Sequence, residues 1–355
     1  MLEENLLIGA RRDVAGRPKT LTKEKLLAYL RAHEGRWVSG ERLSQNFGVS
    51  RSALWKHFQA MREEGLRIDA SPRKGYLVHQ VPDLLLPEEI RQGLNTKIFG
   101  QKRIEALREI DSTNRLAKDL AHQGAPEGTI VIAECQSHGR GRMGRKWFSP
   151  DGHGIYCSFI LRPRLSPADV AGITLMTAVA VADLLRSETD LPAQIKWPND
   201  ILVRGKKISG ILTEASMEMD LVDFAIIGWG LNVNIPLQAF PEDLRGMATS
   251  LLIETGKTFH RRPLLQGFLK RFENLYSIFR TQGLLPIVGR WKEFTDILGR
   301  HITLEVLGKS ITGEVSDIDP SGALLLRDPT GKTHRIHSGD ITLLNSQTSL
   351  SLSEE

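Results

Sequence analysis

A series of helix-start and helix-stop residues between positions 22 and 79 constrains the fold more than any other feature of this sequence. Apolar residues recur at helical spacing, serines stand where a helix can begin, and glycines stand where one can end. The predicted helices are 23–32, then 40–47 after Ser39, then 51–64 between Ser50 and Gly65. With Gly48 at the junction of the second and third, the segment predicts a helix-turn-helix.

A basic hairpin is predicted directly after the third helix. Its strands are 66–70 and 75–79, and its tip is Ser71-Pro72-Arg73-Lys74. Helix, short turn, helix and basic hairpin together are the outline of a winged helix-turn-helix that binds DNA. The alternative is a small helical dimerisation module with a solvated basic face.

In the DNA-binding interpretation the third helix enters a major groove, where Arg and Lys contact phosphates or guanine and Gln pairs with adenine. The residues expected to contact DNA are Arg51, Ser52, Trp55, Lys56 and Gln59 on this helix, and Arg73 and Lys74 at the hairpin tip. Residues 1–80 contain 15 Lys and Arg against 9 Asp and Glu, whereas the remainder contains 32 against 33. This asymmetry indicates a polyanion partner, although a merely soluble basic surface would have the same composition.

The rest of the chain divides into a large mixed segment and a small all-β segment. In the first, the predicted strands are 104–110, 129–135, 155–161, 194–197, 207–215 and 224–232, and the predicted helices are 112–122, 166–187 and 262–281. This mixture predicts an α+β fold, a mixed sheet with helices on one face. In the second, short strands at 302–306, 311–318, 323–326 and 333–336 predict a small β-barrel.

The predicted domain organisation has five parts. They are a flexible tail at 1–21, a winged helix-turn-helix DNA-binding domain at 22–82, a catalytic domain at 83–294, a small barrel at 295–345 and a frayed tail at 346–355. The first 20 residues lack the apolar core of a secretory signal, and no run of about 18 apolar residues predicts a membrane-spanning helix. Cys135 and Cys157 lack metal-ligand spacing, so we expect a reduced, cytoplasmic location with both thiols as packing residues.

The stretch from Gly139 to Trp147, with the sequence GRGRMGRKW, is the most informative for chemistry. Its glycines let the backbone approach a ligand closely, and its three arginines and one lysine cannot all be neutralised locally. Such a loop is expected to become ordered around a carboxylate or a phosphate. It matches neither the common phosphate loop nor the dinucleotide fingerprint, and an RNA-binding or simply exposed basic loop would look the same.

Four further stretches combine polar residues with the ends of strands and helices. Lys196, in the sequence KWPND, stands where it could stabilise charge on a phosphoryl or carboxyl oxygen, although a solvated lysine before a proline turn is the simpler interpretation. Gly210 in KISGIL and the glycines of GWGLNVN allow close approach within strands, or only mark bulges. Asn232 suits an adenine edge, and the helix cap DSTN at 111–114 could also hold a polar ligand. Asn199 and Asp200 could hold a turn or help place magnesium. The histidines show no metal-ligand spacing, so no metal site built from side chains is assigned, and Mg²⁺ is expected to be carried with a nucleotide.

Together these stretches resemble the biotin–protein ligases. The basic loop, KWPND, the strand from Lys207 and the GWGLNVN strand occur in that family's order and at about its spacing, and the resemblance covers residues 84–344. The winged domain resembles the bifunctional subgroup, which also acts as a biotin-responsive repressor of biotin genes. The resemblance implies a catalytic domain like that of class II aminoacyl-tRNA synthetases and an SH3-like C-terminal barrel.

The resemblance also implies a mechanism. The biotin carboxylate attacks the α-phosphorus of ATP, which carries Mg²⁺, and biotinyl-5'-AMP then passes biotin to a lysine of a carrier protein. The residues expected to bind biotin are Ser112, Thr113, Asn114, Gln136, Arg140, Gly141, Arg142, Lys207 and Gly210. Those expected to bind ATP or the adenylate are Arg140, Arg142, Arg145, Trp147, Lys196, Asn199, Leu212 and Asn232. Lys196, Arg142 and Lys207 are the expected catalytic residues, because two anions must be brought together.

Two residues depart from the family's pattern. Met143 stands where a polar or basic residue is common, and Trp229, where small or aliphatic residues are usual, could reshape the pocket floor. The expected partners are the biotin carboxyl carrier protein of acetyl-CoA carboxylase and similar acceptor domains, operator DNA, and a second copy of the chain when the adenylate is bound as corepressor. Two alternatives are a lipoate–protein ligase, which shares fold and chemistry, and a regulator whose ligase domain only senses biotin.

Overall fold

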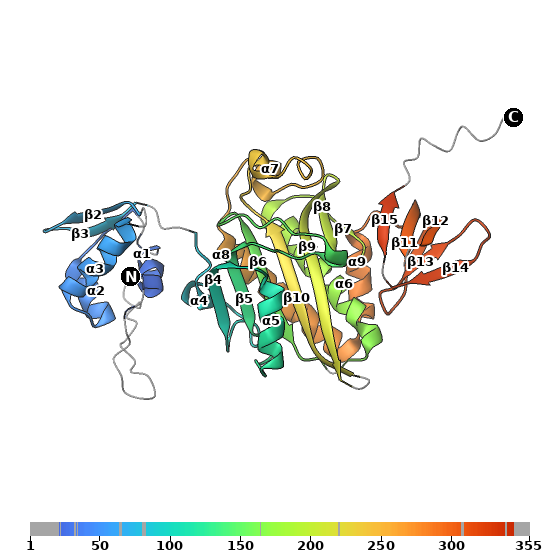
Figure 1. The fold of residues 1–355 in the computed structure, drawn as a ribbon, viewed down its shortest axis with the longest axis horizontal. Helices are drawn as coiled ribbons and strands as arrows, with labels where there is room; N and C mark the ends of the chain where they lie inside the picture. The colour runs from blue at the N-terminus through green and yellow to red at the C-terminus, as the bar shows by residue number, and fades with distance from the viewer. Residues whose placement is uncertain are drawn as a thin grey trace, which may run out of the picture. The chain divides into compact units, whose positions relative to one another are not determined.

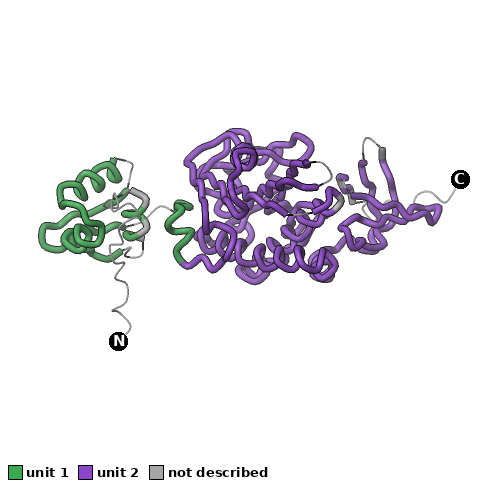
Figure 2. The backbone as a smooth tube through the Cα atoms, turned by 90° about the horizontal axis from the view of Figure 1, so that it is seen from below, with its two compact units in different colours: residues 1–92 green, residues 93–355 purple. Residues whose placement is uncertain are grey.

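The structure, a computed structural model, describes residues 21, 23–31, 33, 35–63, 66–79, 83–163, 165–218, 221–306, 309–337 and 339–343. The predicted tails at 1–21 and 346–355 lie outside these residues, except for residue 21. The predicted helix stop at Gly65 and residues 81–82 also lie outside them. The chain divides into two compact units, residues 1–92 and 93–355 (Figure 2). Each is described by itself.

Unit 1 is a small helical fold with a three-stranded antiparallel sheet. Its helices are α1 (Lys23–Arg31), α2 (Gly40–Phe47), α3 (Arg51–Glu63) and α4 (Pro87–Arg91). Its strands, in the order in which they pair, are β1 (Trp37–Val38), β3 (Gly75–Val78) and β2 (Ile68–Ser71). Two helices joined by a tight turn and followed by a hairpin are the arrangement that the sequence predicts.

Local signals account for unit 1. Ser39 Oγ accepts two backbone N–H groups of the first turn of α2 at 3.2 and 3.5 Å, and Ser50 Oγ accepts one from the first turn of α3 at 3.1 Å. Phe58 of α3 stacks on Tyr76 of β3, with 3.9 Å between ring centroids. The caps therefore begin both helices, and an aromatic pair fixes the hairpin against the third.

Unit 2 is built on a seven-stranded mixed sheet in which the strands pair in the order β4-β5-β6-β10-β9-β8-β7 (Figure 1). In chain order the strands are β4 (Ile104–Ile110), β5 (Ile130–Gln136), β6 (Gly154–Leu161), β7 (Ala193–Lys196), β8 (Asp200–Val203), β9 (Lys206–Glu218) and β10 (Leu221–Asn232). The helices of this unit are α5 (Thr113–His122), α6 (Val170–Thr189), α7 (Leu251–Thr255), α8 (Arg261–Gln282) and α9 (Leu285–Glu293). Only β4 and β5 pair in parallel among these neighbours.

Helices cover both faces of this sheet, so the prediction of helices on one face was wrong. On one face, α5 packs against Phe224 and Ile226 of β10. On the other, Phe268 of α8 stacks on Trp229 of β10, with 3.9 Å between ring centroids. Successive strand residues point to opposite faces, and in Figure 1 α5 lies in front of the sheet with α8 behind it. Each face is apolar over part of its area, and each needs its own cover.

Helix α6 is apolar and long enough to cross a membrane by length and composition alone. It packs instead against α8 and against strands β7 and β9, and two-thirds of its most apolar window is buried. Its composition is therefore that of a core helix.

The chain ends in a five-stranded antiparallel sheet with the pairing order β14-β13-β12-β11-β15. The strands are β11 (His301–Val306), β12 (Lys309–Ile318), β13 (Leu324–Arg327), β14 (Thr333–Ile336) and β15 (Asp340–Leu343). In the part of the chain that the structure describes, β14 and β15 are the edge strands. Strand β15 was not predicted, and neither were β8, α4, α7 and α9.

Candidate active site

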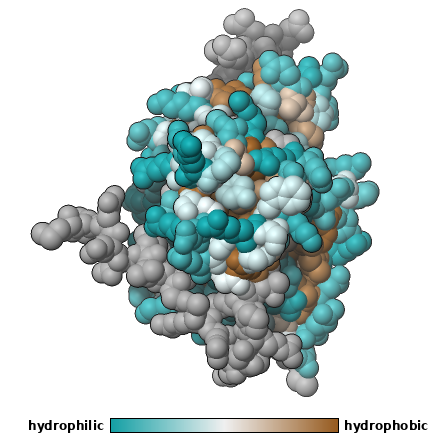
Figure 3. Space-filling model, turned by 90° about the vertical axis from the view of Figure 1, so that its left-hand side faces the viewer, coloured by the Kyte–Doolittle hydropathy of each residue, from teal (hydrophilic) through white to brown (hydrophobic). Residues whose placement is uncertain are grey.

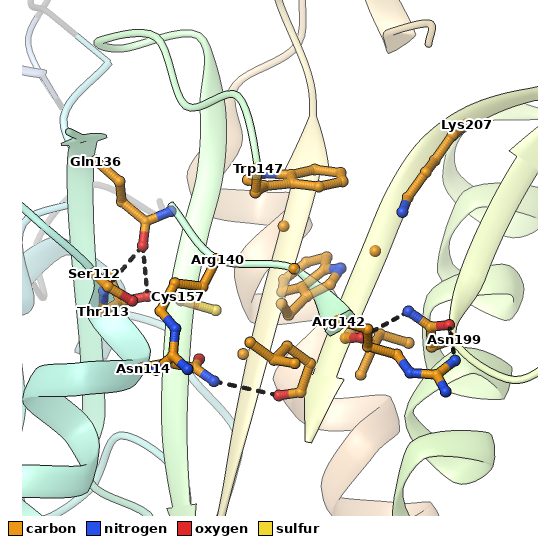
Figure 4. Close-up of a pocket in the computed structure, with 17 residues that line it drawn as sticks. Ser112, Thr113, Asn114, Gln136, Arg140, Arg142, Trp147, Cys157, Asn199 and Lys207 are labelled. Carbon is orange, nitrogen blue, oxygen red and sulfur yellow. Dashed lines mark hydrogen bonds between the residues drawn. The ribbon is translucent and has the colours of Figure 1, made fainter. Parts of the chain in front are cut away.

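A pocket of about 450 Å³, including space open to solvent, lies over strands β9 and β10 between α5 and the basic loop at 139–147. It brings together residues from six separate stretches of the sequence, at 112–114, 136–147, 157, 199, 207–212 and 228–230. The predicted biotin- and ATP-binding residues that line it are Ser112, Thr113, Asn114, Gln136, Arg140, Gly141, Arg142, Trp147, Asn199, Lys207, Gly210 and Leu212. In Figure 4, Gln136, Thr113 and Asn114 lie on one side together with Arg140. Arg142 and Lys207 lie on the other side, and Trp147 lies between the two groups.

The polar side of the pocket is a hydrogen-bond network at the start of α5. Gln136 Oε1 accepts the backbone N–H and the hydroxyl of Thr113 at 2.9 and 3.1 Å, and Gln136 Nε2 donates to Ser149 Oγ at 2.9 Å. Ser112 is buried at the cap position of α5, yet its hydroxyl makes no capping bond. A donor–acceptor set fixed in this way suits a neutral polar ring.

The cationic side of the pocket holds each charged group with a specific partner. Arg142 Nη1 donates to Asn199 Oδ1 at 3.0 Å, and Lys207 Nζ lies 2.7 Å from Asp200 Oδ1. Both cations are partly exposed to the pocket. Among the described residues, no group of three or more His, Cys, Asp and Glu side chains could hold a metal ion. Arg142 and Lys207 can each neutralise a carboxylate or a phosphate.

The basic loop forms a small hairpin. The backbones of Arg140 and Lys146 pair in an antiparallel β-bridge, and Trp147 N donates to Gly139 O at 2.9 Å. At its tip, Met143 has a φ of 54° and a side chain that is 72% exposed. Met143 is therefore not part of the pocket wall, and its side chain extends into solvent.

Trp147 lies directly on a pair of glycines. Gly210 of β9 and Gly230 of β10 are register partners, and a Cβ added to Gly230 would lie 2.4 Å from Trp147 Cε2. Lys207 Nζ lies 5.3 Å from the centroid of the indole ring. The glycines therefore make room for a flat aromatic surface beside a cation, as a purine needs.

A second close approach lies deeper in the pocket. A Cβ on Gly228 would lie 2.0 Å from Oδ1 of Asn114, which accepts a 2.6 Å hydrogen bond from the buried Ser158 hydroxyl. Asn114 Nδ2 donates to Glu214 Oε2 at 2.9 Å, and Glu214 also pairs with Arg140 at 3.3 Å. The side chain of Asn114 is thus fixed on three sides.

Three predicted ATP-binding residues do not line this pocket. Arg145 lies in the exposed part of the loop. Lys196 is the last residue of β7, one strand beyond the Asp200–Lys207 ion pair that joins β8 and β9. Asn232 is buried, and its Nδ2 donates to Thr249 O at 2.9 Å. Their predicted contacts with ATP stay predictions.

Several residues of the site were not among the predicted ones. Cys157 and Ile211 line the pocket and had no signal in the sequence. Gly228, Trp229 and Gly230 line it too. They were not among the predicted ligand-binding residues, but the sequence marked the two glycines for close approach and Trp229 for the pocket floor. Burial raises the pKa of the Cys157 thiol, so this cysteine is a neutral packing group. Ser158 and Glu214 gave no signal, because a serine or a glutamate in a strand is ordinary.

The predicted DNA-contacting residues of unit 1 lie on α3 and on the hairpin tip. Those exposed to solvent are Arg51, Ser52, Trp55, Lys56, Arg73 and Lys74. Gln59 is half-buried, and its Oε1 accepts a hydrogen bond from Arg62 at 3.1 Å. Trp55 is 53% exposed, and the view from the left-hand side of Figure 1 shows a largely hydrophilic face with small hydrophobic patches (Figure 3). A large exposed aromatic among cations is unusual for a merely solvated helix face.

Comparisons with known proteins agree with this geometry. Residues 106–232 match the biotin/lipoate A/B protein ligase family, residues 22–77 match an HTH domain, and residues 297–344 match the biotin protein ligase C-terminal domain. The match at 22–77 agrees with the helix-turn-helix of unit 1 and covers most of the hairpin of β2 and β3.

Relatives that are named as bifunctional ligase/repressors are similar over most of the chain. The bifunctional ligase/repressor BirA of Bacillus spizizenii is 40% identical over 91% of this chain and 99% of its own length. BirA of Escherichia coli is 34% identical over 85% of this chain and 91% of its own. A solved structure, the biotin protein ligase from Aquifex aeolicus in complex with biotin and ATP, has a TM-score of 0.59 and 32% identity, and it covers 69% of this chain and 100% of its own. The chain belongs to the family of bifunctional biotin ligase/repressor proteins.

Proposed function

We propose that this protein is an ATP-dependent biotin–protein ligase that also represses biotin genes. One observation carries the proposal: a single pocket holds a fixed polar network on one side and two partnered cations on the other. A neutral bicyclic ring with a carboxylate tail matches the first side by hydrogen bonding and the second by charge. The relatives named as bifunctional ligase/repressor support the same assignment.

In the first step, biotin binds with its ring against Ser112, Thr113 and Gln136. Its carboxylate oxygen attacks the α-phosphorus of ATP, a phosphoanhydride bond breaks, and pyrophosphate leaves with Mg²⁺. Arg142 and Lys207 screen the repulsion between the two anions, which is the main obstacle to the reaction. Mg²⁺ arrives as part of the substrate MgATP and neutralises the leaving group.

The adenine of the bound nucleotide packs on Trp147. The Gly210–Gly230 pair supports this assignment, because it lets the indole of Trp147 lie close against the sheet, where its ring can stack with a base. Trp147 Nε1 is buried and has no hydrogen-bond partner within the described part of the chain. A polar group in that condition is better satisfied when a ligand occupies the pocket.

In the second step, the neutral ε-amine of an acceptor lysine attacks the carbonyl carbon of biotinyl-5'-AMP. The bond to the phosphate oxygen breaks, AMP leaves, and the amine loses a proton as the amide forms. The basic loop at 139–147 closes over the anhydride and keeps water from hydrolysing it. The acceptor is the biotin carboxyl carrier protein of acetyl-CoA carboxylase or a similar domain.

Repression is assigned to unit 1. Helix α3 enters the major groove of operator DNA, and the hairpin tip contacts the backbone or the minor groove. Biotinyl-5'-AMP is the corepressor: it orders the pocket loops, favours a homodimer, and the two winged domains then bind a two-part operator. Gel filtration of the chain with and without biotin and ATP, paired with DNA binding, tests this. An unchanged monomer at micromolar concentration with unchanged DNA affinity would contradict it.

Finer parts of the assignment are also proposals. They are a class II aminoacyl-tRNA synthetase-like catalytic domain, an SH3-like C-terminal barrel, the domain limits 22–82, 83–294 and 295–345, flexible tails beyond them, and a cytoplasmic location. The arrangement of a mixed sheet with a separate five-stranded antiparallel sheet supports the first two. The sparse, unpaired cysteines support the last.

The first step is tested by biotin-dependent exchange of pyrophosphate into ATP. We expect exchange with biotin, little with lipoate, and a loss of about 10²–10³-fold for Arg142→Ala, which removes one charge-stabilising donor. Arg145→Ala is the matched control from the exposed part of the same loop and should lose less. Binding of biotin without exchange would favour the second candidate, a regulator that only senses biotin; exchange with lipoate but not biotin would favour a lipoate ligase.

A further inference from the structure

The turn between β7 and β8, residues 196–200, is attached to the cationic side of the pocket. Asn199 Oδ1 accepts the 3.0 Å hydrogen bond from Arg142, and the side chain of Asp200 lies 2.7 Å from Lys207. The backbone of Asn199 is also paired with Ile211 on β9, since Ile211 N donates to Asn199 O at 3.0 Å and Asn199 Nδ2 donates to Ile211 O at the same distance. A shift of this turn would therefore displace the partners of both Arg142 and Lys207.

The same turn also contacts the C-terminal sheet, through Trp197. Trp197 is 2% exposed, does not line the pocket, and donates from Nε1 to Gly322 O at 3.3 Å. Gly322 belongs to the C-terminal sheet, in the turn between β12 and β13. One buried side chain thus connects the C-terminal sheet to the segment that holds the pocket cations.

The turn that presents Gly322 is closely fitted to the central part of unit 2. Gly322 has a φ of 91°, and an added Cβ would lie 2.5 Å from Leu175 Cδ1 and 3.1 Å from Leu284 Cδ2. Both leucines are buried. Asp319 fixes the turn from within, because its Oδ1 accepts the backbone N–H of Ser321 at 2.8 Å. The carbonyl that Trp197 contacts therefore has little freedom to move.

The segment between α9 and the C-terminal sheet reinforces the attachment. Ile195 N donates to Phe294 O at 2.6 Å, and Thr295 Oγ1 donates to Ile195 O at 2.9 Å. Lys292 and Asp317 form an ion pair at 2.7 Å. Strand β7 is thus held by the chain that leads into the C-terminal sheet, immediately before the turn that carries Trp197.

We propose that Trp197 and Gly322 are positioning residues for the adenylation step, an inference that rests on the proposed ligase function. The C-terminal sheet holds the 196–200 turn through this contact, and the turn sets the places of Arg142 and Lys207. Neither residue touches substrate. A shift of the turn would misplace the charge-stabilising groups while leaving Ser112, Thr113 and Gln136 unaffected, because these lie on other elements.

The first test compares two glycine substitutions in the C-terminal sheet. Gly322→Ala adds a Cβ against Leu175, whereas Gly331→Ala, at a similar φ of 86°, adds one with nothing within 4 Å. Both carry similar backbone strain, so their difference reports the contact alone. For Gly322→Ala we expect kcat of biotin-dependent pyrophosphate exchange to fall about tenfold, with the KM for biotin changed less than about threefold. Gly331→Ala should keep the wild-type kcat.

The second test compares two buried tryptophans and stays informative if Gly322→Ala does not fold. Trp197→Phe removes the donor to Gly322, whereas Trp291→Phe removes a buried Nε1 that has no hydrogen-bond partner among the described residues. The two changes remove the same volume. We expect only Trp197→Phe to lower kcat, by about threefold to tenfold, since it leaves the Gly322 carbonyl without its donor.

A readout that does not depend on turnover separates this inference from the proposed function. Deuterium uptake by the peptide that contains residues 196–200 should rise in Gly322→Ala and Trp197→Phe and stay unchanged in the two controls. Equal kcat in each variant and its control, or a kcat loss without faster uptake at this turn, would overturn the inference. Inactivity of the wild-type protein with every biotin assay would overturn the proposed ligase instead, and the uptake pattern would still decide whether the contact holds the turn.

Discussion

The two faces of strand β10 differ in what they are built to contact. On one face, the side chain of Trp229, a residue that also borders the pocket, stacks on Phe268 of α8 and donates from Nε1 to Ser209 Oγ at 3.0 Å. On the other face, the neighbouring Gly228 and Gly230 carry no side chain, and Asn114 and Trp147 fill the space above them. Alternate residues of one strand thus serve a packed core and a polar ligand site.

The difference shows how a rigid strand supports a ligand site. A core face tolerates little change in volume, so it fixes the backbone of β10. The glycines then bring this fixed backbone close to a ligand without a side chain in between. We therefore expect substitutions on the packed face to change stability and substitutions on the open face to change binding.

The largest effect is expected on the packed face. Phe268→Ala removes a fully buried ring that contacts Trp229 but does not line the pocket, and it should lower the free energy of unfolding by about 3–5 kcal/mol. Urea denaturation followed by tryptophan fluorescence measures this. Biotin affinity of the folded protein should stay within about threefold of wild type; a larger loss would mean that the two faces are not separable.

The second effect is expected on the open face. Gly228→Ala would place a Cβ 2.0 Å from Oδ1 of Asn114, and this side chain is held by Ser158 and Glu214. Because the whole network must shift, biotin affinity should fall about a hundredfold. Isothermal titration measures the affinity. Gly246→Ala, in an exposed loop with nothing within 4 Å of the added Cβ, is the control, and an equal loss in both would contradict the role of the close approach.

The third effect separates the nucleotide from biotin on the same face. Gly230→Ala would push a Cβ to 2.4 Å from Trp147, so the indole must move. We expect the KM for ATP in pyrophosphate exchange to rise about tenfold and biotin affinity to change less. If biotin affinity falls more than the KM for ATP rises, the assignment of Trp147 to the adenine is wrong.

The smallest effect depends on pH and concerns the C-terminal sheet, whose turn at Gly322 packs against the buried Leu175 and Leu284. Partial burial alone would raise the pKa of Asp319, but hydrogen bonds from Arg335, Ser321 and the backbone of Ala323 outweigh it and lower the pKa to about 2. A lowered pKa means that the ionised carboxylate stabilises the fold above about pH 4 and that this contribution is lost as the pH falls toward 2. Asp319→Asn should therefore cost about 1 kcal/mol at pH 7, and its difference from wild type should shrink toward pH 2.

Thermal unfolding between pH 2 and pH 7 measures that difference. Asn keeps an acceptor for the backbone of the turn and removes only the charge that faces Arg335. A difference that is constant over this range would show that the charge of Asp319 does not contribute.

The sequence predicted unit 1 well because its signals are local. Ser39 and Ser50 act as the caps that their positions suggested, and the hairpin follows where turn residues indicated it. Trp55 was predicted on the exposed side of its helix for the same reason, because side chains three or four residues apart share one helix face and the apolar ones mark the buried face. Interactions between neighbours in sequence can be read without knowing the fold.

Unit 2 was predicted less completely because its decisive contacts join distant residues. The pattern of α5 does not tell which face of the sheet it covers, so the prediction of helices on one face failed. Strand β8 was missed because the residues after Lys196 indicate a proline turn, whereas Asp200 already belongs to the strand. Most of the predicted pocket residues come together, but Glu214 acts through Asn114 and Arg140, and Ser158 through Asn114 and Thr113. No local pattern reveals these contacts.

The most direct measurement of the central claim is the transfer of labelled biotin to a biotin acceptor domain in the presence of ATP and magnesium, beside a lipoate control and Arg142→Ala. The account predicts a stable amide on the acceptor lysine with biotin, little product with lipoate, and a large loss in Arg142→Ala. Biotin bound in the pocket without any transfer to the acceptor would contradict the account and leave the winged domain as the principal function.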